Sequence, residues 1–268
     1  MPQEDVSPAR AQAYAQYVAP TLLGIARRAV DLAELEEGDS VLDVATGTGL
    51  AAFLAAERLG PEGTVIGLDS APAMLAVAGE RALGAGSPQI RWQEGDPARL
   101  AYADESFDAV LLLQSLFTYP RPDAVLEELR RVLVEGGRLV LTTWGSRAGN
   151  EWVDLVERAV RPVLPAPRAL PFTLPQPGNV EALLQGAGYE QIEVGRVGDR
   201  MRFLDANGLW HWAAASREWG ELLGSLDEGA RDRVQSALAT ALAGRQRGGE
   251  ATVGREIVFE RAIAPASP

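Results

Sequence analysis

The stretch that decides the fold of this 268-residue chain is Val41-Leu42-Asp43-Val44-Ala45-Thr46-Gly47-Thr48-Gly49. It belongs to an apolar run, residues 40–45, that is typical of a buried strand. Its glycines allow the backbone to turn sharply and to approach a ligand, because glycine has no Cβ. Residues 50–59 have a helical composition that ends at Gly60-Pro61. The stretch therefore predicts a strand, a glycine turn and a helix whose free N–H groups face a ligand.

Strand-like and helix-like segments alternate from this motif onward. Buried strands are predicted at residues 64–69, 90–95, 107–113 and 139–144, and helices at 72–83 and 122–133. Gly136-Gly137 predicts a turn before the fifth strand. Five strands alternating with helices imply right-handed βαβ units, which build an α/β fold with a doubly wound, mostly parallel sheet. Two further strands are predicted at 192–197 and 256–262, which makes the sheet seven-stranded.

The chain divides into three parts that we expect to form one structural domain. Residues 1–36 are an N-terminal helical segment whose helix starts at Ser7-Pro8, a cap residue followed by proline in the first turn. Residues 37–145 are the cofactor-binding core. Residues 146–268 complete the sheet and carry two helical cap insertions. These insertions lie at 146–180, where prolines crowd a loop-rich crossover, and at 203–245, which predicts two helices, the first rich in aromatic residues.

Composition excludes several classes of function. The chain carries 37 acidic and 25 basic residues, a net charge of −12, so it should be repelled by phosphate backbones and nucleic acid is not an expected partner. With no cysteine and one histidine, disulfides, thiolate sites and multi-histidine metal sites are excluded, and no metal is predicted. No apolar run has membrane-spanning length and the first residues are acidic, so we expect a cytoplasmic protein without a membrane partner. The sequence does not predict an oligomeric state, and a homodimer is one of the states it allows.

The glycine motif alone fits two cofactor classes. Gly47 to Ala52 matches the G-x-G-x-x-G/A pattern of dinucleotide enzymes, and Asp69 lies 20 residues after Gly49, where an acid binds an adenosine ribose in either class. Asp43 inside the strand end favours a cationic ligand over pyrophosphate. The acid in Glu94-Gly95-Asp96 can accept a hydrogen bond from an adenine amino group. An NAD(P)-dependent oxidoreductase is therefore the less favoured alternative.

Five ordered motifs carry a resemblance to a known family. They are Val41 to Gly49, Gly67 to Leu75, Glu94-Gly95-Asp96, Ser106 to Val110 and Arg131 to Leu139. Together they resemble class I S-adenosylmethionine-dependent methyltransferases, and most closely the ubiquinone/menaquinone-biosynthesis type. The resemblance is strong over residues 40–145 and weaker beyond. It implies a Rossmann-like methyltransferase fold whose last strand is antiparallel, with S-adenosylmethionine as cofactor and S-adenosylhomocysteine as product.

The resemblance also implies roles for particular residues. Asp43, Ala45, Gly47 and Gly49 would hold the methionine end of the cofactor, although Ala45-Thr46 stands where a Cys-Gly pair is frequent. Asp69 would bind the ribose hydroxyls. The full predicted cofactor set is Asp43, Ala45, Thr46, Gly47, Gly49, Asp69, Ser70, Met74 against adenine, Asp96 and Pro97 at the adenine edge, and Gln114 facing the methyl group.

Methyl transfer needs alignment, exclusion of water and, for a weakly acidic acceptor, a base. His211 and Tyr119 are the candidate catalytic residues. The candidate substrate pocket consists of Tyr14, Tyr17, Phe117, Trp144, Phe172 and Trp210. These residues favour methylation at oxygen or carbon of a small, largely apolar molecule. A methyltransferase-like enzyme that uses the same cofactor for another reaction, such as a cyclisation, is the alternative.

Overall fold

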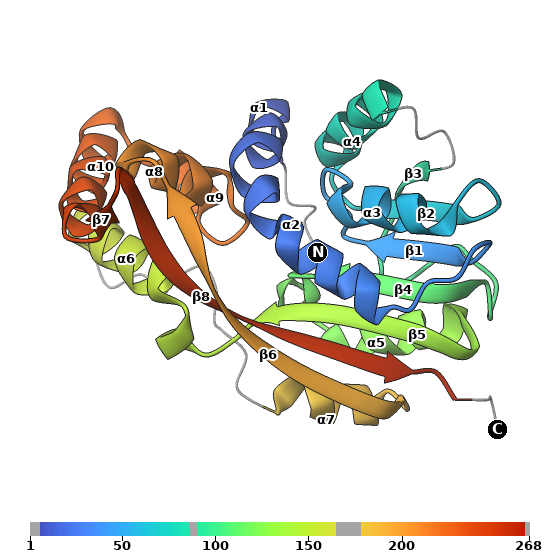
Figure 1. The fold of residues 1–268 in the computed structure, drawn as a ribbon. Helices are drawn as coiled ribbons and strands as arrows, with labels where there is room; N and C mark the ends of the chain where they lie inside the picture. Colours follow the sequence, from blue (N-terminus) through green and yellow to red (C-terminus); the bar gives the residue numbers. More distant parts are fainter. Residues whose placement is uncertain (1–5, 86–89, 165–177, 266–268) are drawn as a thin grey trace.

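A computed structural model describes residues 6–85, 90–164 and 178–265 of the chain. Its centre is one sheet with the strand order β3-β2-β1-β4-β5-β8-β6 (Figure 1). The first five strands in chain order pair in parallel, whereas β8 runs antiparallel to both β5 and β6. The mostly parallel seven-stranded sheet with an antiparallel last strand is therefore confirmed, with a two-residue strand β7 added at the edge of β8. The strands are β1 Ser40–Val44, β2 Thr64–Asp69, β3 Ile90–Glu94, β4 Phe107–Leu113, β5 Leu133–Trp144, β6 Glu190–Phe203, β7 Gln246–Arg247 and β8 Glu250–Ile263.

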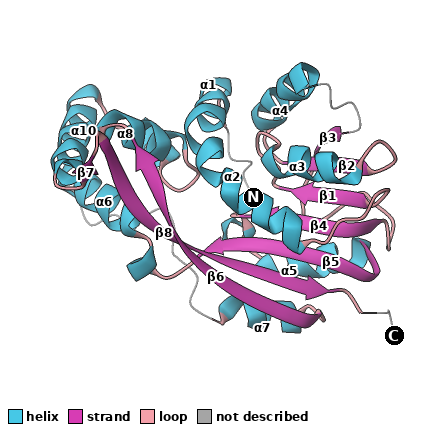
Figure 2. Cartoon of the chain, in the orientation of Figure 1, coloured by secondary structure: helices cyan, strands magenta, loops and turns pink. Residues whose placement is uncertain are grey.

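Helices cover both faces of the sheet, as the doubly wound pattern requires (Figure 2). α2 and α3 pack on one face, where alanines and valines form a core with Val41, Val65 and Leu111 of the strands. α5 and α7 pack on the other face against a second core that includes Leu42 and Leu112. These helices are α2 Ala19–Leu32, α3 Leu50–Leu59, α4 Pro72–Ala85, α5 Pro122–Val132 and α7 Asn179–Gly186, and short 3-10 turns occupy Leu116–Thr118, Arg147–Gly149 and Arg161–Val163.

The N-terminal helix is interrupted where it passes over the sheet edge. Ser7 caps α1 (Pro8–Ala13) by accepting a hydrogen bond from the Arg10 amide at 3.2 Å, as predicted. Between α1 and α2 the backbone forms a π-helix, Tyr14–Val18. Pro20, the second residue of α2, has no N–H to donate, so one backbone hydrogen bond of the regular helix is missing. π-helical turns of this kind widen a helix locally and often lie at functional sites.

In the part of the cap that the structure describes there are four helices: α6 Glu151–Val160, α8 Ala206–Ala215, α9 Gly220–Gly224 and α10 Glu228–Ala243. In Figure 1 they gather beyond the ends of β6 and β8, whose antiparallel ribbon reaches into them. Two helices were predicted within 203–245, and the structure has three, because short links around Ser216 and Ser225 divide the segment twice. Within the helical insertion predicted at 146–180, the structure has α6, where Trp152, Val156 and Val160 recur at helical spacing and are buried.

The predicted turn at Gly136-Gly137 is instead a bulge within β5. Leu133 pairs with Phe107 of β4, and the next paired residues are Arg138 and Ala109. Four residues of β5 therefore stand opposite one of β4. Gly136 has a φ of +75°, a left-handed conformation that glycine adopts without steric cost. The bulge keeps the fifth strand in register with its neighbours although α5 ends directly before it.

Glu260 is a buried acid in the middle of β8. Its side chain is 1% exposed and its Oε2 atom has no hydrogen-bond partner within the described residues. Burial, with the nearby charge of Glu181, raises the pKa of the Glu260 carboxyl to about 8, against a partial opposing effect of Arg196. The folded chain therefore favours the protonated form, and stability is lost as the pH rises from the ordinary pKa of 4.5 through 8.

Glu260→Gln should consequently stabilise the protein in a pH-dependent way. We expect the free energy of unfolding to rise by roughly 2–5 kcal/mol at pH 9 and by much less at pH 5. Glu193→Gln, in the adjacent strand β6 and 69% exposed, is the matched control and should be nearly neutral at both values. Urea unfolding of the three proteins measures this. An equal effect of Glu260→Gln at pH 5 and pH 9 would contradict the assignment.

Candidate active site

The carboxyl ends of β1, β2, β4 and β5 meet at a cavity of about 80 Å³. In open parallel sheets ligands bind at this edge. The N-terminal helices and the cap close the cavity from above, and α1 contacts both α4 and α8 (Figure 1). The lining residues are Val6, Arg10, Tyr14, Val18, Leu22, Ala45, Gly47, Asp69, Ser70, Ala71, Met74, Leu113, Gln114, Ser115, Trp144, Trp212, Ala215, Arg217 and Glu218.

Asp43 is buried near the end of β1, and its side chain accepts hydrogen bonds from the glycine turn and from α3. Its Oδ2 accepts hydrogen bonds from the Thr46 hydroxyl at 2.6 Å and from the Ala52 amide at 3.0 Å. Asp43 itself does not line the cavity. Burial raises its pKa to about 7, with a smaller contribution from the charge of Asp69, while the two hydrogen bonds act in the opposite direction. Asp43 thus ties the turn to the first residues of α3.

Asp69 lies at the end of β2 and lines the cavity directly. Its two oxygens accept the amide protons of Gly47 at 2.8 Å and of Ala71 at 2.9 Å. The carboxylate therefore joins the loop after β1 to the loop after β2. Burial raises its pKa, and the hydrogen bonds together with Arg217 oppose that shift. This position matches the predicted ribose acid, whose role remains a prediction.

Two glycines near the site make room for an aromatic ring. Gly67 of β2 pairs in register with Trp92 of β3, and a Cβ on Gly67 would lie 2.5 Å from the Trp92 ring. A Cβ on Gly49, whose φ is +85°, would lie 2.6 Å from the same ring. Trp92 in turn stacks edge-on against Phe53 of α3. Gly49 therefore serves packing as well as the turn, a reason that the motif alone did not reveal.

Gln114 is held in an uncommon conformation just beyond β4. Its φ is +56°, and Ala45 beyond β1 has a φ of +54°. Such left-handed conformations cost energy for residues with a side chain and cluster at active sites. The Gln114 amide donates from Nε2 to the Thr142 hydroxyl at 3.3 Å, while its Oε1 is buried and has no hydrogen-bond partner among the residues that the structure describes. An unpaired acceptor beside the cavity suits a ligand that brings N–H or O–H donors.

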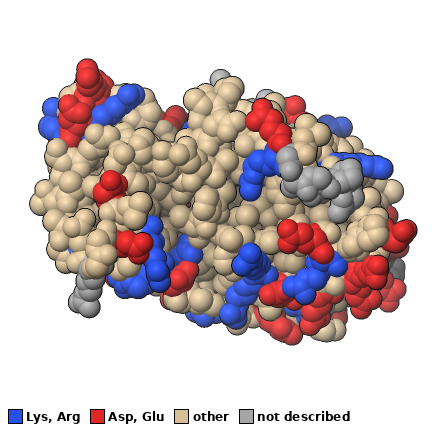
Figure 3. All heavy atoms as spheres, turned by 45° about the horizontal axis from the view of Figure 1, so that its top comes forward, with Lys and Arg blue, Asp and Glu red and all other residues tan. Residues whose placement is uncertain are grey.

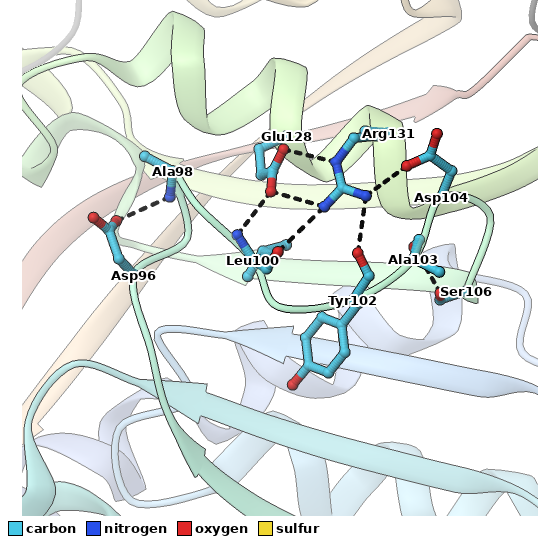
Figure 4. Close-up of polar contacts among 9 residues, drawn as sticks. All are labelled: Asp96, Ala98, Leu100, Tyr102, Ala103, Asp104, Ser106, Glu128 and Arg131. Carbon is cyan, nitrogen blue, oxygen red and sulfur yellow. Dashed lines mark hydrogen bonds and ion pairs between the residues drawn. The ribbon is translucent and has the colours of Figure 1, made fainter.

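Asp96 belongs to a pinned loop outside the cavity. Its Oδ1 accepts the Ala98 amide at 2.9 Å, so it begins a turn, and the side chain is exposed. Figure 4 shows that Arg131 of α5 donates hydrogen bonds to Asp104 and to the Tyr102 carbonyl in the loop after β3. Arg131 also pairs with Glu128 of the same helix. The acid–arginine pairs of this helix therefore fix the loop after β3, and Pro97 is buried beneath it. Neither Asp96 nor Pro97 lines the cavity, and their predicted contact with adenine remains untested.

The predicted substrate residues divide into two groups. Tyr14 and Trp144 line the cavity. His211 instead stacks on Tyr17 with ring centroids 4.7 Å apart, and neither ring lines the cavity. Burial and the nearby charge of Asp69 raise the pKa of Tyr119 to about 12, while Arg217 acts in the opposite direction. Three more predicted residues also lie off the lining. These are Phe117, Tyr119 and Trp210, and Phe172 lies outside the described residues.

Eleven lining residues were absent from the predicted site, and four of them carry a charged or large aromatic side chain: Arg10, Trp212, Arg217 and Glu218. Trp212 belongs to a cluster of aromatic rings with Trp152 at 5.3 Å, and Trp152 also contacts Trp144 at 5.0 Å. This cluster joins the cap to the end of β5. Arg217 and Glu218 lie in the short link between α8 and α9. Isolated charges in a helical link resemble ordinary solvated side chains, so the sequence offered no signal for them.

Comparisons with known proteins identify the class. Residues 41–137 match a family model described as a methyltransferase domain. Nocamycin O-methyltransferase of Saccharothrix syringae is 31% identical over 255 residues, which cover 88% of this chain and 89% of that protein. 2-Phytyl-1,4-naphtoquinone methyltransferase of Synechococcus elongatus is 42% identical over 116 residues, 43% of this chain and half the length of that relative. The solved [4+2]-cyclase SpnF shares the fold, with a TM-score of 0.56 at 20% identity over 91% of this chain and 82% of its own.

The chain therefore belongs to the class I S-adenosylmethionine-dependent methyltransferases. Its strand order is the one that this fold requires, with β8 as the antiparallel strand between β5 and β6. The site fits the family's cofactor, because a carboxylate and an unpaired amide oxygen face the cavity where a cationic ligand with hydroxyl and amino donors would bind.

The outer surface mixes charges of both signs. Figure 3 shows blue and red side chains side by side on the face that it draws. Ion pairs such as Arg131 with Asp104 at 2.6 Å and Arg147 with Asp154 at 2.5 Å contribute to this mixing. Within the described residues, no helix is both long and apolar enough to cross a membrane.

Proposed function

We propose that this chain transfers the methyl group of S-adenosylmethionine to oxygen or carbon of a small, largely apolar molecule. The observation that carries the proposal is the division of the cavity into two halves. The half at β1, β2 and α4 is lined by Ala45, Gly47, Asp69, Ser70 and Met74, all from the predicted cofactor set. The half at β4, β5, α2 and α8 is lined by the apolar and aromatic side chains of Leu22, Leu113, Trp144, Trp212 and Ala215, together with the polar Ser115, Arg217 and Glu218.

The cofactor half would bind through groups that the chain already presents. Asp69 accepts from the ribose hydroxyls, and Met74 offers an apolar surface to the adenine ring. Gly47, with a φ of +56°, lets the backbone approach the methionine end under the ring of Tyr14. When bound, the cofactor supplies an activated methyl group on a sulfonium. Gln114, between the two halves, orients that end through its Oε1, which accepts no hydrogen bond from the described part of the chain.

The acceptor half sets the class of substrate. Rings of Trp144 and Trp212 offer flat apolar walls, and Val18 and Leu22 of the N-terminal helices close the other side. A small apolar molecule gains free energy by leaving water for these walls, and water is excluded from the reacting atoms. The named relatives methylate small molecules according to their names, which supports a small-molecule substrate here as well.

The proposal is tested by transfer of a tritiated methyl group from S-adenosylmethionine. The protein is incubated with mixtures of apolar phenols, enols and quinols, and label is counted in the organic extract. We expect label to enter the extract only when protein and acceptor are both present. Cofactor binding without any transfer of label would favour the alternative, a reaction such as a cyclisation that leaves the methyl group in place.

Asp43 should make cofactor binding release protons near neutral pH. Its pKa of about 7 means that the ligand-free carboxyl is about half protonated at pH 7. A cationic ligand bound nearby lowers that pKa, so up to about half a proton should be released per molecule bound, and affinity should rise with pH through 7. Calorimetry in two buffers with different ionisation heats measures the release. Asp43→Asn should remove it; an unchanged release in this variant would assign the proton to another group, such as Asp69.

A further inference from the structure

Glu218 is a charged side chain held at the acceptor half of the cavity. It lies in the link between α8 and α9, is half-buried and lines the cavity. The indole N–H of Trp144 donates a hydrogen bond to its Oε1 at 2.7 Å. Trp144 ends β5 and is itself 9% exposed, so the partner that orients the carboxylate is firmly packed.

The link that carries Glu218 is fixed from the N-terminal helix. Arg10 of α1 donates from Nη2 to the Ser216 carbonyl at 2.9 Å. The same guanidinium lies against Gly220, where an added Cβ would come within 2.5 Å of it. The close packing of Arg10 on the glycine therefore sets the position of the link, and with it the direction of the Glu218 side chain.

Glu218 differs from the other acid at the cavity. Among the lining residues that the structure describes, the carboxylates are Asp69 and Glu218. Asp69 lies at β2, and its oxygens already accept two backbone amides. Glu218 accepts one hydrogen bond within the described residues, so lone pairs remain for a ligand. Its charge reaches the cavity, because it contributes to the raised pKa of the Tyr14 hydroxyl.

We infer that Glu218 accepts the proton of a hydroxyl group on a flat, apolar substrate, a phenol or an enol, and that Trp144 positions Glu218 for this step. The inference rests on the proposed function and narrows it to O-methylation. The hydroxyl proton passes to the carboxylate as the oxygen lone pair forms the new O–CH₃ bond. The S–CH₃ bond breaks with its electron pair remaining on sulfur, and Glu218 later returns the proton to water. A carboxylate at this place also selects hydroxyl-bearing molecules, since it accepts their hydrogen bond before reaction.

Binding to the S-adenosylhomocysteine complex tests the selectivity without catalysis. Equilibrium dialysis compares 2-naphthol with 2-methylnaphthalene, which has the same shape and no donor. We expect the unmodified protein to bind 2-naphthol at least tenfold more tightly than the hydrocarbon, and Glu218→Leu to lose this preference. Glu221→Leu, three residues away on the exposed side of α9, should keep it. A preference that survives in Glu218→Leu overturns the inference.

Turnover of 2-naphthol with tritiated cofactor tests the proton transfer. Glu218→Gln keeps an acceptor for the Trp144 indole but lacks basicity, and should lower turnover about 100- to 1000-fold. The defect should shrink at least tenfold with 6-cyano-2-naphthol, a more acidic analogue that needs less help to lose its proton. Trp144→Phe should lower turnover about tenfold, with the same partial recovery on the acidic analogue. Equal defects on both naphthols would show a structural role instead and overturn the inference.

Cofactor affinity separates the two levels of failure. Glu218→Gln should bind S-adenosylhomocysteine within about twofold of the unmodified protein, because the substitution keeps the size of the side chain and the proposed cofactor half is lined by residues of β1, β2 and α4. If the unmodified protein binds S-adenosylhomocysteine but neither binds nor methylates 2-naphthol, the inference fails and the proposed function stands. If S-adenosylhomocysteine does not bind at all, both fail.

Discussion

Asp69→Ala should weaken the binding of S-adenosylmethionine and S-adenosylhomocysteine by roughly 1.5–3 kcal/mol, which is about 10- to 150-fold. The carboxylate lines the cavity and joins the loops after β1 and β2 through the Gly47 and Ala71 amides. In the proposed binding mode, its removal would deprive the two ribose hydroxyls of a charged acceptor, and it would also leave the Gly47 and Ala71 amides without this partner. Both effects act on the cofactor half of the site, so substrate selectivity should change little.

Calorimetry with S-adenosylhomocysteine measures the loss, and circular dichroism verifies that the variant is folded. Glu62→Ala is the matched control, because Glu62 is an exposed acid in the loop before β2, at the opposite edge of the sheet. Asp69→Asn, which keeps one acceptor, should fall between the two. A folded Asp69→Ala protein with an unchanged dissociation constant would mean that another residue binds the ribose.

Gly67→Ala should destabilise the fold by about 1–3 kcal/mol, a fall in melting temperature of several degrees for a chain of this size. The new Cβ would lie 2.5 Å from the Trp92 ring and 3.1 Å from the Thr46 hydroxyl. Trp92 is packed between Gly67, Gly49 and Phe53, so its ring has little space to move aside. The strain reaches the glycine turn, and cofactor affinity should fall as well.

Two further variants isolate the cause of that effect. Gly67→Ala combined with Trp92→Leu removes the obstructing ring, and the double variant should be more stable than the sum of the two single changes predicts. Gly195→Ala places the same methyl group in strand β6, where nothing lies within 4 Å of the new Cβ, and should be close to neutral. Thermal unfolding is measured for the unmodified protein, Gly67→Ala, Trp92→Leu, the double variant and Gly195→Ala. Strictly additive effects would show that the Trp92 contact is not the cause.

The parts of the fold that could be predicted from the sequence depend on local signals. The bounds of β1, β2, β4 and α3 agree with the structure to within a residue or so, because each is an apolar run or a helical segment that ends at glycine, proline or a charged turn. β6 and β8 were predicted far too short. They extend each other by pairing along their whole length, and no local pattern reports a pairing between residues so far apart in the chain.

The candidate site divides in the same way. Asp43 and Asp69 could be placed because each lies within the last two residues of a strand that belongs to a recognisable motif. Glu218 and Arg10 could not, since they reach the cavity only through the packing of α1 on the link between α8 and α9. His211, the one histidine, was predicted as a catalytic residue because imidazole can act as a base. In the structure its ring stacks on Tyr17 and does not line the cavity. Residue type alone does not tell which side of a cap helix faces the site.

The central claim, that the cavity at the ends of β1, β2, β4 and β5 binds S-adenosylmethionine, is tested most directly by calorimetric titration of the unmodified protein. Both S-adenosylmethionine and S-adenosylhomocysteine should bind saturably with micromolar affinity, which corresponds to about −8 kcal/mol. Oxidised and reduced nicotinamide dinucleotides should give no saturable heat. The opposite pattern, saturable binding of a nicotinamide dinucleotide and no heat with either adenosyl compound, would contradict the account.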